Sequence, residues 1–180
     1  GVYNIDSNET EVFNLFEGYN PAVKTELSQD TQEYRNKVLK PYFDMATELF
    51  EGNESHRDFI FKLIALKIQF PNIKITRILP IIMGPQAVGK NFFFDVIADV
   101  IGKRHFISSA KPSVFFGEHA EGYVHNLVAV FDEQERRAGK SDYMALIKND
   151  SANTHMVVNG KNQKPIKMRN LCQLFMLSNK

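Results

Sequence analysis

The first part of the chain carries hydrophobic residues at helical spacing. Over Asp30–Leu49 they recur every three or four positions, which predicts a helix that stops before Gly52. A second helix is predicted to begin at Asn53 or Ser55 and to end at Pro71. Its apolar residues form one wide face, made of Phe59, Ile60, Leu63, Ile64, Leu66, Ile68 and Phe70. We therefore expect the second helix to be largely buried.

Beyond Pro71 the pattern changes to short apolar runs that alternate with helical segments. Three runs predict strands that are covered on both faces, as in a parallel sheet: Thr76–Met83, Leu127–Phe131 and Leu171–Leu177. Helices are predicted between them, over Lys90–Val100 and around Ser141–Lys148. Phe106-Ile107 is compatible with a short strand, and Pro112–Phe116 with the start of a helix.

Strands that alternate with helices predict an α/β fold whose layers enclose a parallel sheet. We place this core at residues 73–180 and a small, mainly helical module at residues 1–72. The chain has 180 residues, of which 43% are hydrophobic and 24% charged, so it can bury one sizeable core. It begins with Gly-Val rather than Met, which suggests a piece of a longer protein.

Charge and cysteine content exclude several classes of function. A net charge of +1 gives no overall nucleic-acid signature, so any DNA contact must come from a local patch. The single cysteine, Cys172, rules out an internal disulfide and a Cys-rich zinc site, and it fits a reducing, cytoplasmic location. No apolar run approaches the ~20 residues that span a bilayer, and no secretory leader is visible, so we expect no membrane association.

An eight-residue stretch between a predicted strand and a predicted helix has the pattern of a phosphate-binding loop. It consists of Gly84, Pro85, Gln86, Ala87, Val88, Gly89, Lys90 and Asn91. The glycines let successive N–H groups converge on phosphate oxygens, and Lys90 can reach the β- and γ-phosphates. Such patterns also occur by chance. The usual Ser or Thr ligand of Mg²⁺ is replaced here by Asn91, whose amide oxygen is still a hard ligand.

Two acidic residues, Asp132 and Glu133, directly follow the apolar run that ends at Phe131. In phosphate-loop hydrolases, the first carboxylate of such a pair holds Mg²⁺ and the second polarises the attacking water. A charged pair can also simply end a strand. Its occurrence about 40 residues after a phosphate-binding loop favours the catalytic interpretation.

The last apolar run ends in Ser178-Asn179. Asn after a strand is usually a turn residue. If this strand lies between the strand of the loop and the acidic strand, however, Asn179 could touch the γ-phosphate and orient the attacking water.

The segment His155–Arg169 predicts a hairpin. Asn159-Gly160 is its strongest local turn signal, and a tip at Asn162-Gln163 would also pair the two apolar stretches. Four cations gather on this ribbon: Lys161, Lys164, Lys167 and Arg169. They either contact nucleic-acid phosphates or protect a solvated edge from aggregation, and spacing alone does not decide between these two roles.

The order of these elements resembles the superfamily 3 helicases of small DNA viruses, phages and plasmids. Within them it is most similar to the primase-helicases of phages and of large DNA viruses such as poxviruses. The resemblance runs from about Ile78 to Asn179, with Gly84–Asn91 as motif A, Phe131–Glu133 as motif B, Lys148–Lys164 as motif B′ and Leu177–Asn179 as motif C. Phe61–Pro71 and Val12–Tyr19 also resemble segments found before motif A in that branch.

This resemblance implies a P-loop NTPase core of the AAA+ type, with three layers, that assembles as a ring, usually a hexamer. Such rings hydrolyse ATP with Mg²⁺ and move on single-stranded DNA, in the cytoplasm, or in that of the host if the protein is viral. The implied roles are phosphate binding by Lys90, Mg²⁺ ligation by Asn91 and Asp132, base catalysis by Glu133 and sensing by Asn179. The implied DNA contacts are Lys161, Asn162, Lys164 and Lys167.

Members of this family place an arginine finger beyond motif C, and the present sequence ends at Lys180. An arginine supplied across a subunit interface is worth ~10³ or more in rate, so we expect weak hydrolysis by this chain alone. Arg136 and Arg137 lie close to the acidic pair but are more simply loop charges.

Two other functions stay open. One is a non-motor module of a larger primase-polymerase, either a domain that binds nucleotide for structure or a DNA-binding or assembly piece. The other is a small phosphotransferase, which normally needs an Arg-rich lid and a substrate pocket that are not visible in the sequence. Stimulation by single-stranded DNA separates a motor from a phosphotransferase, and ring assembly separates it from a structural module.

Overall fold

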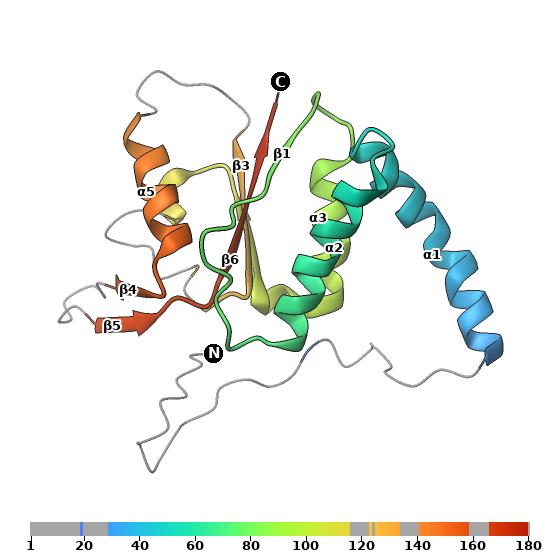
Figure 1. Cartoon of the computed structure of the whole chain (residues 1–180), viewed down its shortest axis with the longest axis horizontal. Coiled ribbons are helices and arrows are strands. Elements are labelled where there is room, and N and C mark those ends of the chain that lie inside the picture. Colours follow the sequence, from blue (N-terminus) through green and yellow to red (C-terminus); the bar gives the residue numbers. More distant parts are fainter. Residues whose placement is uncertain are drawn as a thin grey trace, which may run out of the picture.

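The structure of the chain, a computed structural model, describes residues 19, 29–115, 123, 125–133, 141–158 and 166–179. Its main sheet has four parallel strands in the order β1-β6-β3-β2 (Figure 1). They are β1 (Ile81–Met83), β2 (Phe106–Ser109), β3 (Val128–Glu133) and β6 (Gln173–Ser178). The latest of these in the chain, β6, pairs with both β1 and β3. The predicted α/β fold with a parallel central sheet is thus confirmed.

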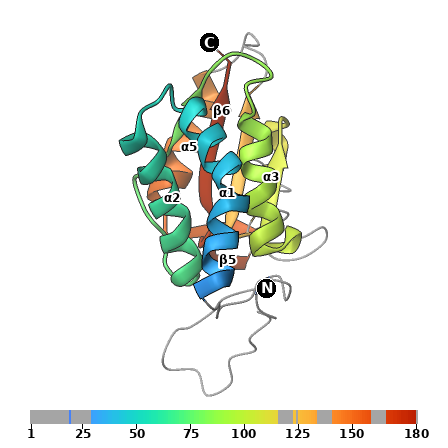
Figure 2. The ribbon, with the colours of Figure 1, turned by 90° about the vertical axis from the view of Figure 1, so that its right-hand side faces the viewer.

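Helices cover both faces of this sheet (Figures 1 and 2). On one face lie α1 (Gln29–Leu49), α2 (Glu54–Gln69) and α3 (Lys90–Ile101), and on the other lies α5 (Ser141–Ala152). Two short 3-10 helices flank β2, η1 (Lys103–His105) and η2 (Pro112–Val114). An antiparallel pair, β4 (His155–Val158) and β5 (Ile166–Arg169), precedes β6. The predicted helices are therefore confirmed, with ends that differ by a few residues.

Residues of the central strands alternate between two hydrophobic cores, one on each face of the sheet. In β3, Val128 and Val130 join the core beneath α1, α2 and α3, whereas Ala129 and Phe131 join the core beneath α5. In β6, Phe175 and its neighbours alternate in the same way. Burial on both faces explains why these strands read as unbroken apolar runs in the sequence.

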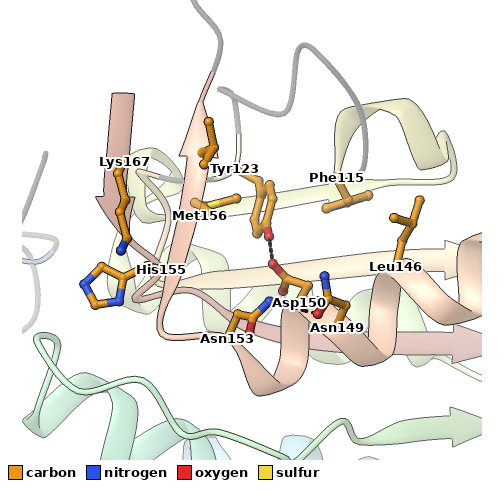
Figure 3. Close-up of a pocket in the computed structure, with 10 residues that line it drawn as sticks. Phe115, Tyr123, Leu146, Asn149, Asp150, Asn153, His155, Met156 and Lys167 are labelled. Carbon is orange, nitrogen blue, oxygen red and sulfur yellow. Dashed lines mark hydrogen bonds between the residues drawn. The ribbon is translucent and has the colours of Figure 1, made fainter. Parts of the chain in front are cut away.

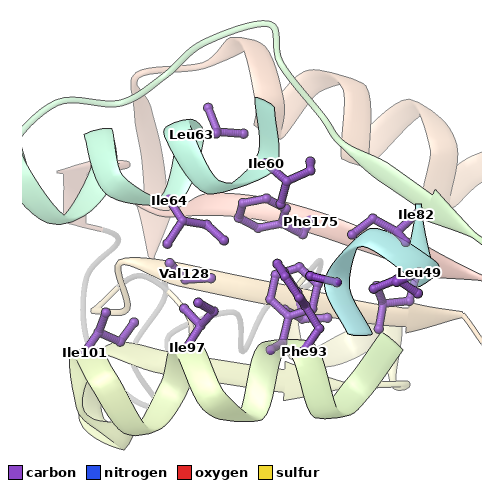
Figure 4. Packing of buried hydrophobic residues seen from close by; sticks show 14 of the residues in the cluster. Leu49, Ile60, Leu63, Ile64, Ile82, Phe93, Ile97, Ile101, Val128 and Phe175 are labelled. Carbon is purple, nitrogen blue, oxygen red and sulfur yellow. The ribbon is translucent and has the colours of Figure 1, made fainter. Parts of the chain in front are cut away.

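The two N-terminal helices share a core with the sheet. Ala46 and Leu49 of α1 and Ile60, Leu63 and Ile64 of α2 pack in one cluster with residues of α3, β3 and β6 (Figure 4). The boundary near residue 72 stays a prediction, and across it the packing is continuous.

The predicted burial of α2 is only partly correct. Phe59, Leu66 and Phe70 are 50%, 42% and 47% exposed, although all three lie on the apolar face that the sequence predicted to be buried. Only the stripe of α2 that contacts the sheet and its neighbouring helices is covered. Because the apolar face is wider than this stripe, the sequence overestimates the burial of the apolar residues that lie outside the stripe.

Strand β1 is shorter than predicted, since it begins at Ile81 and not at Thr76. Arg77 adopts a left-handed conformation with φ of 65°, and its N–H donates to Ser151 O at 2.8 Å. This turn, followed by Pro80, which has no N–H to donate, keeps the preceding segment out of the sheet.

The predicted hairpin is present as β4 and β5. Their register runs from His155 opposite Arg169 to Val158 opposite Ile166. This register is incompatible with a two-residue turn at Asn159-Gly160, because Val158 pairs with Ile166 and not with residue 161. The connecting residues 159–165 lie outside the described residues.

Among the helices that the structure does describe, none is long and apolar enough to cross a bilayer.

Cys172 is fully buried directly before β6, and this burial raises the pKa of its thiol from 9.0 to about 12. Because the pKa of this thiol is higher in the folded chain, the unfolded chain loses the proton at a lower pH than the folded chain does. Stability should therefore fall as the pH rises from 9 toward 12, by about 1.4 kcal/mol per pH unit from this group. Urea unfolding at pH 8 and pH 10 should show the natural chain losing stability relative to Cys172→Ala. A stability difference that does not change with pH would contradict this expectation.

Candidate nucleotide-binding site

The predicted phosphate-binding loop connects β1 to α3 at the carboxyl ends of the parallel strands (Figure 1). Gly84 N–H donates to Ser178 O at 3.2 Å, which fixes the start of the loop to the end of β6. At the other end, Gly89 caps α3 in a left-handed conformation with φ of 92°, and its carbonyl accepts from Phe93 N–H at 2.9 Å. Helix α3 thus directs its positive end toward the loop, as a phosphate site requires.

The backbone at Gly89 predicts a specific sensitivity to substitution. An added Cβ would lie 3.4 Å from Met45 Sδ of α1, an ordinary contact, so the main cost of Gly89→Ala would come from its positive φ. We expect a loss of about 1–2 kcal/mol in the free energy of unfolding. Gly84→Ala is a matched control, because Gly84 does not have a positive φ and its Cβ would lie 3.5 Å from Val88 Cγ2. Equal losses in urea unfolding would contradict this account.

The side chain of Lys90 connects the loop to the residue that follows β6. Its side chain is 7% exposed, and its ammonium donates to Gly84 O and Pro85 O at 2.7 Å and to Asn179 Oδ1 at 3.1 Å. The strand order places β6 between β1 and β3, which is the condition under which Asn179 was predicted to reach the site. The structure therefore brings the loop lysine and the predicted sensor together.

The two predicted Mg²⁺ ligands also meet. Asn91, on the first turn of α3, donates through Nδ2 to Asp132 Oδ2 of β3 at 3.0 Å. A half-turn of the amide would present its oxygen at the same place. Mg²⁺ is usually held by one or two carboxylates together with substrate phosphates and water. Among the described residues no cluster of three or more His, Cys, Asp or Glu forms a closed metal site. One carboxylate and one amide oxygen beside the predicted phosphate-binding loop thus fit Mg²⁺.

The remaining predicted site residues are placed less completely. Glu133 is the last residue of β3 and is paired in register with Ser178, so its backbone lies at the same edge of the sheet. Lys161, Asn162 and Lys164 lie outside the described residues, as do Arg136 and Arg137. Lys167 is exposed on β5, at the opposite end of the sheet from the loop (Figure 1).

A polar network beneath α5 could not be recognised in the sequence. Asp150 accepts hydrogen bonds from Tyr123 Oη and, at 2.8 Å, from Asn170 Nδ2. Its second oxygen lies 3.6 Å from Lys74 Nζ, which in turn donates to Cys172 O at 3.0 Å. Burial raises the pKa of Tyr123, so this phenol stays protonated. These residues are far apart in the chain and follow no motif, so no local signal could have identified them.

Comparisons with known proteins support the fold. Two apo structures of the C-terminal region of NrS-1 superpose with a TM-score of 0.63 at 20% identity, and each covers 76% of this chain. A further structure of that region gives a TM-score of 0.60 at 19% identity. The chain spans about a third of those structures, 32% and 33% of their length in the first two. At this level of identity the likeness shows the fold alone.

No curated protein matches the chain. Residues 82–180, which contain the loop and all four strands of the main sheet except the first residue of β1, match a family described as a family of unknown function, DUF5906. Because the match covers more than half of the chain, the chain belongs to the DUF5906 family.

Proposed function

We propose that this chain is the nucleotide-binding part of an ATP-driven DNA motor in a replication protein. One observation carries the proposal: Lys90 contacts Asn179, and Asn91 contacts Asp132, at the carboxyl ends of three adjacent parallel strands. Four side chains with the chemistry of phosphate and Mg²⁺ binding thereby converge from the three separate motifs that the sequence predicted.

Each residue has a distinct role in this proposal. Lys90 would exchange the carbonyl oxygens of Gly84 and Pro85 for phosphate oxygens when ATP enters. Asn91 and Asp132 would hold Mg²⁺, which when bound neutralises charge on the β- and γ-phosphates. Glu133 would take the proton of the attacking water, and Asn179, which already lies beside Lys90, would orient that water.

A role on DNA is supported by the similarity to superfamily 3 primase-helicases. The hairpin of β4 and β5 lies at the end of the sheet away from the loop, so nucleotide and DNA would bind at separate places (Figure 1). The chain shares its fold with the C-terminal region of NrS-1.

The test is Mg²⁺-dependent ATP hydrolysis with and without single-stranded DNA. It should be measured on this chain and on a chain that continues past Lys180, each beside its Lys90→Ala variant. We expect DNA-stimulated turnover in the longer chain that vanishes in the variant. Nucleotide binding through Lys90 without hydrolysis in either chain would instead favour the non-motor module. Turnover that DNA does not change would favour a phosphotransferase.

A further inference from the structure

A pocket of about 370 Å³ lies between α5 and the hairpin strands β4 and β5 (Figure 3). Phe115 and Tyr123, which are 1% and 0% exposed, form part of its wall together with Met156. This volume falls at the small end of the range for ligand pockets, which is roughly 300–1,000 Å³. The phosphate-binding loop contributes no residue to its lining.

One side of the pocket carries two amide groups. Asn149 lies on the last turn of α5 and Asn153 directly follows this helix, and Asn153 Nδ2 donates to Asn149 Oδ1 at 2.9 Å. This bond orients both amides. It leaves donor capacity on the Asn149 amide nitrogen and acceptor capacity on the Asn153 amide oxygen. A neighbouring donor and acceptor match the edge of a nucleobase.

The opposite side carries an exposed imidazole and an exposed ammonium. His155 Nδ1 lies 3.0 Å from Thr154 Oγ1, which holds the ring, and Figure 3 shows the Lys167 ammonium pointing toward it. The imidazole of His155 can stack on a base, and the ammonium of Lys167 on β5 can bind a backbone phosphate.

Among the described residues that line the pocket, the one carboxylate, Asp150, is already compensated. It accepts from Tyr123 and Asn170 and lies 3.6 Å from the ammonium of Lys74, whose side chain is only 4% exposed. Its charge is therefore directed into the protein, and it opposes an anionic ligand less than a solvated carboxylate would.

We infer that this pocket binds one nucleotide unit of a single-stranded nucleic acid. The base enters between His155 and the two amides, and its phosphate lies at Lys167. A protein side chain would use the apolar wall but not the combination of amide pair, imidazole and cation. This inference rests on the proposed function, because it assumes that DNA passes the hairpin, and it adds a base-binding position to it.

The test compares two probes by fluorescence anisotropy: a labelled dT15 strand and a labelled 15-residue abasic sugar-phosphate strand. The Asn149→Ala/Asn153→Ala variant should bind dT15 about tenfold more weakly, the loss expected for one base contact, and bind the abasic strand as the natural chain does. Lys167→Ala should weaken both strands. Gln32→Ala and Lys62→Ala are matched controls, since both residues are exposed on helices of the other sheet face.

A second measurement reports on the pocket without deleting a contact. Leu146 lies at its rim and is 44% exposed, whereas the natural Cys172 is buried, so a fluorophore on Leu146→Cys labels the rim selectively. Its emission should change on addition of dT15 and saturate with the affinity found by anisotropy.

The inference is overturned if the amide variant binds dT15 like Gln32→Ala, if it loses equal affinity for both strands, or if the natural chain does not bind dT15. A rim label that is insensitive to dT15 also overturns it, and would return the pocket to a protein partner. Failure of the proposed function looks different: the pocket would bind dT15 as described, yet DNA would stimulate no ATP hydrolysis in the longer chain.

Discussion

Replacing Lys90 with Ala should weaken the binding of ATP by about a hundredfold or more. The ammonium is held within the loop by Gly84 O, Pro85 O and Asn179 Oδ1, so it is already positioned where phosphate would enter. A charged hydrogen bond is worth about 1.5–3 kcal/mol, and Lys90 would form more than one to the phosphates. Titration of a fluorescent ATP analogue measures the loss directly.

Two comparisons make the Lys90 result specific. Lys62→Ala removes an exposed lysine of α2 and should leave ATP affinity unchanged. Lys90→Ala also deprives two loop carbonyls of their donor, so its urea unfolding should be measured alongside. A variant that folds like the natural chain and still binds ATP normally would remove Lys90 from the phosphate site.

Glu133→Gln should keep nucleotide binding and lose hydrolysis by roughly 10²–10⁴-fold, the usual contribution of a general base. The substitution keeps the length of the side chain and leaves Asn91 and Asp132, the proposed Mg²⁺ ligands, in place. Single-turnover hydrolysis in a chain that turns over ATP separates this effect from binding.

Asp132→Asn provides the contrast, because it alters the proposed metal ligand and not the base. It should raise the Mg²⁺ concentration that half-saturates hydrolysis, whereas Glu133→Gln should not. Hydrolysis by Glu133→Gln at the natural rate would exclude Glu133 as the base.

The parts of the fold that the sequence predicted are those with a local signature. The apolar runs of β3 and β6 are continuous because helices cover both faces of the sheet, and α3 begins directly after a glycine with a positive φ. The end of each strand then located Asp132 and Asn179 at one edge. Parallel pairing alone brings the ends of neighbouring strands together, so the site could be predicted without side-chain coordinates.

What the sequence did not predict is which side chains the surrounding structure buries. Too many residues of α2 were predicted to be buried, because a sequence shows which residues are apolar but not how much of a helix its neighbours cover. No sequence pattern indicates the burial of Lys67, which is 1% exposed and whose ammonium donates to Pro71 O and Ile73 O at 2.8 Å. Burial lowers the pKa of Lys67 to about 8. The DNA contacts at Lys161, Asn162 and Lys164 stay predictions.

The place of β6 in the sheet has a consequence for how the chain folds. β1 and β3 are separated by β6 and do not pair with each other, yet among the four described strands of this sheet β6 comes latest in the chain. Before β6 is synthesised, β1 has no strand to pair with, and β2 and β3 form a two-stranded sheet whose β3 edge is unpaired. Such long-range parallel pairing folds slowly, and unpaired strand edges favour aggregation. During synthesis the nascent chain would therefore hold exposed strands until β6 joins them.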